Sequence, residues 1–136
     1  MKKIIFIISL MLLPMISFGQ SIHSSTGSYE GKVESNGSVY DRTGSYKGKV
    51  DSSGNIYDRA GSCRGKVDRG RFYDRTGAYI GKIEDNGNVY DRTGSYKGKI
   101  DKSGNIYDRT GSYIGKVPNV KRSTVAAIRF FGFLLQ

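Results

Sequence analysis

Two kinds of basic residue recur along the chain at nearly constant spacing. A lysine follows the glycine of every Gly-Lys-(Val/Ile) step, and an arginine follows every Tyr-Asp pair. Such side chains attract anions, and repetition turns weak single contacts into multivalent binding. They form the candidate binding surface, which comprises Lys32, Lys49, Lys66, Lys82, Lys99, Lys116, Arg42, Arg59, Arg75, Arg92 and Arg109.

An aspartate precedes each of these arginines. If the repeats surround an axis, the carboxylates form a ring that is suited to binding an ion or a ligand. Alternatively, each carboxylate accepts backbone N–H groups where a turn begins. The second interpretation is favoured, because the Asp-x-x-Gly turns lack the several acidic ligands of a calcium loop. We predict no metal and no cofactor. The aspartates are Asp41, Asp58, Asp74, Asp91 and Asp108.

The residues required for nucleophilic or general-base catalysis are scarce. The chain has one histidine, His23, ahead of the repeats, and one cysteine, Cys63, where sister repeats carry tyrosine. Neither a Ser/His/Asp nor a Cys/His set is available in the repeats. A single cysteine also excludes an intramolecular disulfide. We therefore predict that the protein is not an enzyme, and that Cys63 is a core or sheet residue rather than a reactive thiol.

These residues belong to a sequence unit that is repeated along the chain. Tyr-Asp-Arg occurs five times, at spacings of 17, 16, 17 and 17 residues, and Gly-Lys-(Val/Ile) occurs six times. Short β-prone segments alternate with Asp-x-x-Gly turns, whose glycines should have positive φ, and no helical period is present within residues 27–117. One repeat has a two-residue turn, yet Val67 can still face Phe72. The array is therefore predicted to be all-β.

An odd repeat would turn successive units inside out unless a bulge absorbs one residue. Hairpins arranged around an axis avoid this problem, and closure removes exposed sheet edges. The predicted inward pairs are too few to order the chain, so we also expect tyrosine rings to be buried between units. These pairs are Val33/Val39, Val50/Ile56, Val67/Phe72, Ile83/Val89 and Ile100/Ile106.

The repeat Tyr-Asp-Arg-Thr-Gly-Ser-Tyr-Lys-Gly-Lys-(Val/Ile)-Asp-x-Ser-Gly-Asn-(Val/Ile) and its five Tyr-Asp units resemble the 5-fold beta-flower proteins, small exported bacterial proteins. The resemblance covers about two-thirds of the chain. It implies about five hairpins of some 17 residues around a pseudo-five-fold axis. It implies no activity and no functional residues.

Both ends of the chain differ from the array. Residues 1–19 have the basic, apolar and small-residue regions of a signal peptide, and residues 20–26 form a polar leader before the repeat domain at 27–117. Residues 118–136 form a short apolar tail, in which Ser123 or Thr124 could cap a helix over 125–135. We expect the tail to cover an apolar end of the axis. An oligomer contact, a membrane-surface helix or a strand are the alternatives.

Charge and export limit the classes of function. Of 22 basic and 12 acidic residues, loss of Lys2 and Lys3 with the signal peptide leaves 20 against 12, a net charge of +8. We predict an exported, periplasmic or extracellular protein without a transmembrane span in its mature chain. Its expected role is to bind an acidic polysaccharide or another envelope anion, with no specific nucleic acid. The alternative is an assembly protein that forms homo-oligomers through residues 119–136.

Overall fold

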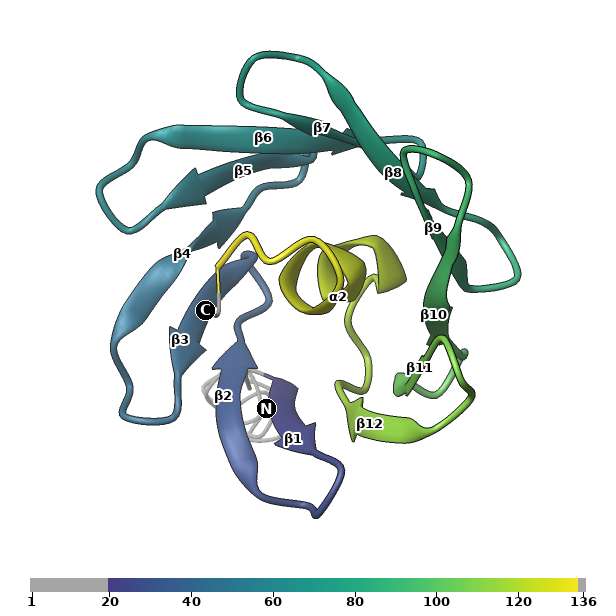
Figure 1. The fold of residues 1–136 in the computed structure, drawn as a ribbon. Helices are drawn as coiled ribbons and strands as arrows, with labels where there is room; N and C mark the ends of the chain where they lie inside the picture. The colour runs from purple at the N-terminus through teal and green to yellow at the C-terminus, as the bar shows by residue number, and fades with distance from the viewer. Residues whose placement is uncertain (1–19, 135–136) are drawn as a thin grey trace, which may run out of the picture.

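The computed structural model describes residues 20–134, which form twelve antiparallel strands in a closed barrel and one helix, α2, inside it (Figure 1). Each strand pairs with its neighbours in sequence, and the first strand pairs with the last. The all-β prediction and closure of the array are therefore confirmed. The elements are β1 (Gln20–Ser24), β2 (Tyr29–Val33), β3 (Ser38–Asp41), β4 (Tyr46–Val50), β5 (Asn55–Asp58), β6 (Cys63–Asp68), β7 (Arg71–Asp74), β8 (Tyr79–Ile83), β9 (Asn88–Asp91), β10 (Tyr96–Ile100), β11 (Asn105–Asp108), β12 (Tyr113–Lys116) and α2 (Arg122–Arg129).

Alternation of side chains along each strand decides what faces the interior. In β4, Gly48 and Val50 are buried while Lys49 between them is partly exposed. Val50 pairs with Ile56 across the turn to β5, as predicted, and Ile56 is fully buried. All five predicted apolar pairs are register partners. The Val/Ile/Phe positions therefore line the barrel wall from within.

Two kinds of turn connect the strands. Inner turns join β2–β3, β4–β5, β6–β7, β8–β9 and β10–β11, whereas outer turns join the remaining consecutive pairs and lie at the periphery of the ring (Figure 1). The predicted positive φ is confirmed, for example at Gly54 (89°) and Gly104 (88°). Each inner turn also bonds to the next: the N–H of Val50 donates to the oxygen of Gly37, and that of Val67 to Gly54. Neighbouring units are thus joined by hydrogen bonds through these turns.

A β-bulge absorbs the odd residue of the repeat. In the hairpin of β3 and β4, Tyr40 pairs with Tyr46 and Val39 with Gly48, so Lys47 is the extra residue. The other hairpins closed by outer turns shift register at the equivalent point. In the short repeat Val67 still pairs with Phe72, and Arg69 and Gly70 form the turn with φ of 50° and 80°. Every unit therefore keeps its apolar residues inside.

The leader predicted for residues 20–26 is corrected by the structure, because residues 20–24 form strand β1. Ile22 is fully buried, as its counterparts are, and His23 pairs with Tyr29 where other hairpins pair two tyrosines. The described residues thus contain six hairpins closed by outer turns, one more than the Tyr-Asp-Arg count. The first hairpin escaped that count because His23 and Ser24 replace Tyr-Asp. The signal peptide predicted for residues 1–19 lies outside the described residues.

The tail enters the ring rather than covering its end. Helix α2 begins at Arg122 and its N-cap is Lys121, with no side-chain cap, so the prediction of capping by Ser123 or Thr124 was wrong. Val125, Ala126 and Ala127 are fully buried, and Ile128 nearly so. The predicted apolar pairs were too few to form the core alone. The helix completes the core by filling the interior of the barrel (Figure 1).

After α2, successive side chains lie against the glycines of successive Gly-Lys steps. A Cβ atom on Gly98 would lie 2.7 Å from Phe130 Cε1, and one on Gly65 would lie 2.9 Å from Phe133 Cε1. Phe131 and Leu134 contact Gly81 and Gly48 in the same way. At these four steps a side chain in place of glycine would occupy the space of the tail, and it would also meet a backbone oxygen of the neighbouring strand.

The predicted burial of the tyrosine rings is found in part: six of the ten tyrosines are half-buried, and four tyrosine pairs are in ring contact. Tyr29, Tyr46, Tyr96 and Tyr113 are about 40% exposed, and no tyrosine belongs to the buried core. The interior is filled by the apolar side chains of the tail instead. Within residues 20–134, no helix has both the length and the apolar character needed to cross a membrane.

Candidate binding surface

A lysine and two further residues, both aromatic in five of the six units, lie side by side on the outer face of the barrel. Lys32 of β2 is the register partner of Tyr40, which in turn pairs with Tyr46. Register partners point to the same face of a sheet, and here that is the face opposite the buried glycines and valines. We call each such set a Lys–Tyr triplet. The six triplets are Lys32/Tyr40/Tyr46, Lys49/Tyr57/Cys63, Lys66/Tyr73/Tyr79, Lys82/Tyr90/Tyr96, Lys99/Tyr107/Tyr113 and Lys116/His23/Tyr29.

The rings of a triplet contact one another. The Tyr90 and Tyr96 centroids lie 5.8 Å apart at 63°, and the other tyrosine pairs have similar geometry. His23 and Tyr29 pack edge to face at 6.2 Å, so the histidine substitutes for a tyrosine. Lys82 Nζ lies 5.5 Å from the Tyr90 centroid, and Lys32 and Lys66 adopt the same position over Tyr40 and Tyr73. Aromatic surface and positive charge are thus combined in each unit.

Few carboxylates compensate these lysines. Among the described residues, the ion pairs of the triplet lysines are Lys32–Glu34 at 3.3 Å and Lys82–Glu84 at 3.2 Å, both at least partly exposed. Exposed pairs of this kind contribute about 0–1 kcal/mol. In two other units the acidic position is an aspartate whose carboxylate accepts N–H groups of its own turn; Asp51, for example, accepts those of Ser53 and Asn55. These aspartates are thus engaged in their own turns rather than paired with the lysines.

The arginines of the candidate surface occupy the outer turns instead. Arg42, Arg59, Arg75, Arg92 and Arg109 are all exposed. Beside Arg42, the Asp41 carboxylate accepts the Thr43 hydroxyl at 2.6 Å and the Ser45 N–H at 3.0 Å. This confirms that the aspartates stabilise turns. The arginine and lysine bands are therefore separate, with arginines at the turns and lysines on the strands.

Hydrogen bonds to these aspartates favour their ionised form. The Thr43 hydroxyl and then the Ser45 N–H lower the pKa of Asp41, and Asp74, Asp91 and Asp108 have lowered pKa values through the equivalent threonine hydroxyls and backbone amides. Because a lowered folded-state pKa adds stability above the unfolded value, about 3.9, this contribution is lost as pH falls below that value and through the folded pKa.

We expect Thr43→Ala to raise the pKa of Asp41 towards the ordinary aspartate value, because the strongest hydrogen bond to the charged form is removed. A pH titration of the carboxyl carbons by NMR measures the change. Asp108 in the same sample is the internal control, since its partner Thr110 is untouched. An unchanged Asp41 titration would contradict the role assigned to the hydroxyl.

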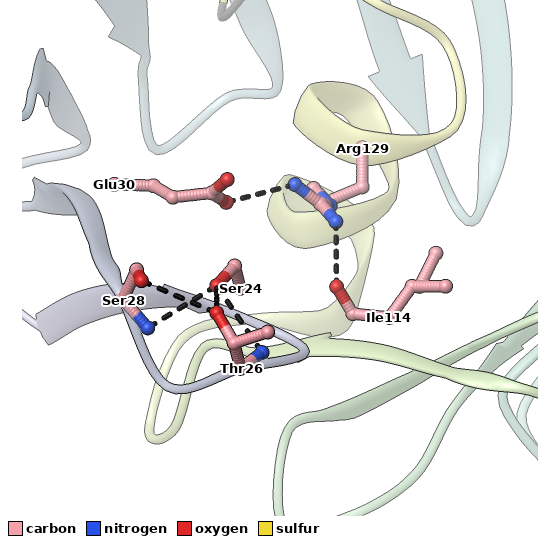
Figure 2. Close-up of polar contacts among 6 residues, drawn as sticks. All are labelled: Ser24, Thr26, Ser28, Glu30, Ile114 and Arg129. Carbon is pink, nitrogen blue, oxygen red and sulfur yellow. Dashed lines mark hydrogen bonds and ion pairs between the residues drawn. The ribbon is translucent and has the colours of Figure 1, made fainter.

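The seam where the first strand meets the last is built differently from the other junctions. Strands β1 and β12 share only the register pairs His23–Lys116 and Ser24–Gly115. Arg129 of α2 reaches across the seam: it donates to Glu30 Oε1 at 3.1 Å and to the Ile114 oxygen at 2.9 Å (Figure 2). One side chain of the tail thus joins β2 to β12.

The outer turn beside this seam carries no charge. Ser24 takes the place of aspartate, and its hydroxyl accepts the N–H groups of Thr26 at 3.3 Å and Ser28 at 3.1 Å (Figure 2). Residue 25, where the other units have arginine, is also serine. The arginine band therefore has a gap at the seam, whereas Lys116 continues the lysine band across it.

The profile of the 5-fold beta-flower protein family matches residues 19–134. The chain belongs to this family. No curated protein and no solved structure matches this beta-flower protein. The family match covers β1 and the tail as well as the repeats, in agreement with their place in the barrel.

Sequence reasoning missed several residues that complete this beta-flower protein. Arg129 and Phe131 lie in the tail, and nothing in the repeat indicates which glycine each will meet. Cys63 lies in β6 opposite Tyr57 and is exposed, so it is a sheet residue and not a core residue. Within residues 20–134, no cluster of three or more His, Cys, Asp or Glu side chains is placed to hold a metal ion.

Proposed function

We propose that this beta-flower protein is an exported, non-enzymatic binding module for an anionic glycan of the cell envelope or of the surroundings. Repetition of the Lys–Tyr triplet on the outer face carries the proposal. Each triplet offers an ammonium group for a sulfate or carboxylate. In four triplets the residue farthest from the lysine is a tyrosine exposed enough to pack against the flat face of a sugar, namely Tyr29, Tyr46, Tyr96 and Tyr113.

The arrangement favours extended partners. The units follow one another around the barrel, and we infer that they are related by rotation about a common axis, so that equivalent lysines form a ring. Single contacts at such exposed sites are weak, but a polymer that spans several units gains from effective concentration. A long acidic polysaccharide therefore fits this surface better than a small molecule does.

The lysines should decide binding. We expect the protein to bind heparin or polygalacturonate in 0.01 M salt and to lose at least about tenfold in affinity at 0.15 M, because the Debye length falls from about 30 to about 8 Å. Lys49→Glu combined with Lys99→Glu should abolish binding. Isothermal titration calorimetry measures both effects, and circular dichroism verifies folding.

A matched double variant distinguishes the effect of the triplet lysines on binding from the effect of net charge. Lys102→Glu combined with Arg69→Glu makes the same change in net charge at two exposed inner-turn residues outside the triplets. This variant should retain most of the binding. If both double variants lose affinity equally, or if the wild type binds no polyanion in 0.01 M salt, the proposed role of the lysine ring is wrong.

The structure favours no second function. Self-association through residues 119–136 would require apolar side chains at the surface, yet Val125, Ile128 and Leu134 are buried within the ring. An assembly role would need the tail to leave the interior.

A further inference from the structure

One position on the outer face carries an extra positive charge in a single unit. In every unit, the residue just before the buried apolar residue of the odd-numbered strand is the register partner of a triplet lysine on the next strand. In β7 this residue is Arg71. In the other five units it is neutral, namely Ser21, Ser38, Asn55, Asn88 and Asn105. Arg71 therefore distinguishes one unit of the barrel from the other five.

Arg71 lies on the same face as the Lys–Tyr triplets. It is exposed while the next residue, Phe72, is fully buried, so the guanidinium points away from the interior. Tyr73, two residues further along β7, lies on the same face at a spacing of about 7 Å. Lys66 Nζ lies 5.8 Å from the centroid of the Tyr73 ring. A guanidinium and an ammonium group thus flank one half-buried tyrosine ring.

Neither of these two cations has an ion-pair partner. Asp68 is the register partner of Arg71, but its carboxylate oxygen Oδ1 lies 3.4 Å from Arg69 Nε. Within residues 20–134, neither Arg71 nor Lys66 forms an ion pair. The nearest carboxylate is therefore already paired with another arginine, and the two cations keep their full attraction for an external anion.

The equivalent residue of two other units is bonded to its own turn. The Asn105 side-chain amide donates to Asp101 Oδ2 at 3.0 Å, and that of Asn55 donates to Asp51 Oδ2 at 3.5 Å. In the short turn between β6 and β7, Arg71 replaces this asparagine and makes no such bond within the described residues. Its guanidinium can donate two parallel hydrogen bonds to one carboxylate or sulfate, which a lysine cannot do.

We propose that Arg71 is the primary contact for the acidic glycan, and that with Lys66 it binds one carboxylate or sulfate group of the sugar chain beside Tyr73. This inference rests on the proposed function and deepens it. A ring of equivalent lysines would bind a polymer equally well in any of six positions. With Arg71 in one unit, the chain of sugars has one preferred position, and the remaining triplets add contacts along it.

Short oligosaccharides test the preferred position, because a polymer contacts several units at once. The two probes are tetragalacturonate, whose charges are all carboxylates, and a heparin tetrasaccharide, which also carries sulfates. In 0.01 M salt, either should give saturable shifts in the ¹⁵N spectrum at Lys66, Arg71 and Tyr73, including the Arg71 side-chain N–H. Equivalent residues of the other units should shift much less. Tighter binding of tetragalacturonate identifies a carboxylate as the preferred group, and tighter binding of the heparin fragment identifies a sulfate.

Two matched variants test the guanidinium. Arg71→Asn introduces the residue that three sister strands carry at this position, so folding should be unaffected. It should weaken tetrasaccharide binding about tenfold or more, as expected for hydrogen bonds between charged groups. Arg69→Asn removes the same charge from the same turn, at a positive φ of 50° that asparagine tolerates. Because Arg69 is paired with Asp68, this variant should retain most of the affinity.

A transplanted arginine provides the converse test. In the hairpin of β8 and β9, Lys82 Nζ lies 5.5 Å from the Tyr90 centroid, although Lys82 is also paired with Glu84. Asn88 lies two residues before Tyr90, as Arg71 does before its own tyrosine. Adding Asn88→Arg to the Arg71→Asn variant should therefore restore part of the affinity and move the largest shifts to β8 and β9.

The outcomes separate this inference from the proposed function. Equal shifts in all units, equal losses in Arg71→Asn and Arg69→Asn, or binding of polygalacturonate without binding of either tetrasaccharide would overturn the role of Arg71. The lysine ring would still stand if polymer binding continued to depend on Lys49 and Lys99. If no polyanion binds in 0.01 M salt, both the proposed function and the preferred position are wrong.

Discussion

Gly81→Ala should be among the most destabilising single substitutions in this protein. A Cβ atom there would lie 2.5 Å from the Tyr90 oxygen and 2.6 Å from Phe131 Cε1, with φ at 152°. Overpacking costs about 1–3 kcal/mol and backbone strain about 1–3 kcal/mol, so we expect a loss of about 2–6 kcal/mol. Urea denaturation followed by circular dichroism measures the free energy of unfolding.

The outer turns provide the matched control. Gly77 also has a positive φ, 88°, but a Cβ atom there would meet nothing within 4 Å. Gly77→Ala should therefore cost only the strain, about 1–3 kcal/mol. Equal losses at the two glycines would show that the contact between Gly81 and the tail is not what requires glycine.

Removal of residues 119–136 should unfold the barrel. The tail contributes Val125, Ile128 and Leu134 to the core and packs three phenylalanines against it. At about 1.5–3 kcal/mol for each large side chain, this burial is comparable to the whole stability of a typical domain, about 5–15 kcal/mol. We expect the truncated protein to lose NMR amide dispersion and its cooperative thermal transition.

Single substitutions test the contribution of the tail to stability more finely than truncation does. Phe131 stacks on Phe72 with centroids 4.4 Å apart, so Phe131→Ala should cost about 2–4 kcal/mol. Tyr113→Ala removes a ring that is 41% exposed on the outer face and should cost about 1 kcal/mol or less. If the truncated protein keeps a cooperative transition near the wild-type temperature, the hairpins close into a barrel without the tail.

The repeat could be predicted from sequence because its signals are local. Apolar pairs such as Val67/Phe72 and glycines such as Gly54 are determined by residues only a few positions apart. The place of the tail could not be predicted in this way. Whether Phe131 faces solvent, a second copy or Gly81 depends on the width of the ring, which no single unit encodes. His23 was missed because an imidazole replaces a phenol in the same aromatic contact.

The candidate binding surface, too, could be predicted from the sequence only in part. Its residues could be listed from the repeat, since equivalent positions recur in equivalent places. Which of them share a face could not, because the bulge at residues such as Lys47 shifts the alternation. The lysines lie beside tyrosines on the strands while the arginines stand apart at the turns, and the register shows which tyrosine each lysine meets.

Pairing of β1 with β12 has a consequence for the order of folding. His23 and Lys116 are partners across 93 residues, whereas all other strand pairs are between sequence neighbours. Hairpins form in microseconds, but joining the two ends carries the loop-closure entropy of nearly the whole domain. When the chain is released with its N-terminus first, the edge of β1 that pairs with β12 stays unpaired until the last repeat is available. During that interval, an edge strand of a second copy is its main competitor, so slow chain release and high concentration should favour strand-exchanged dimers.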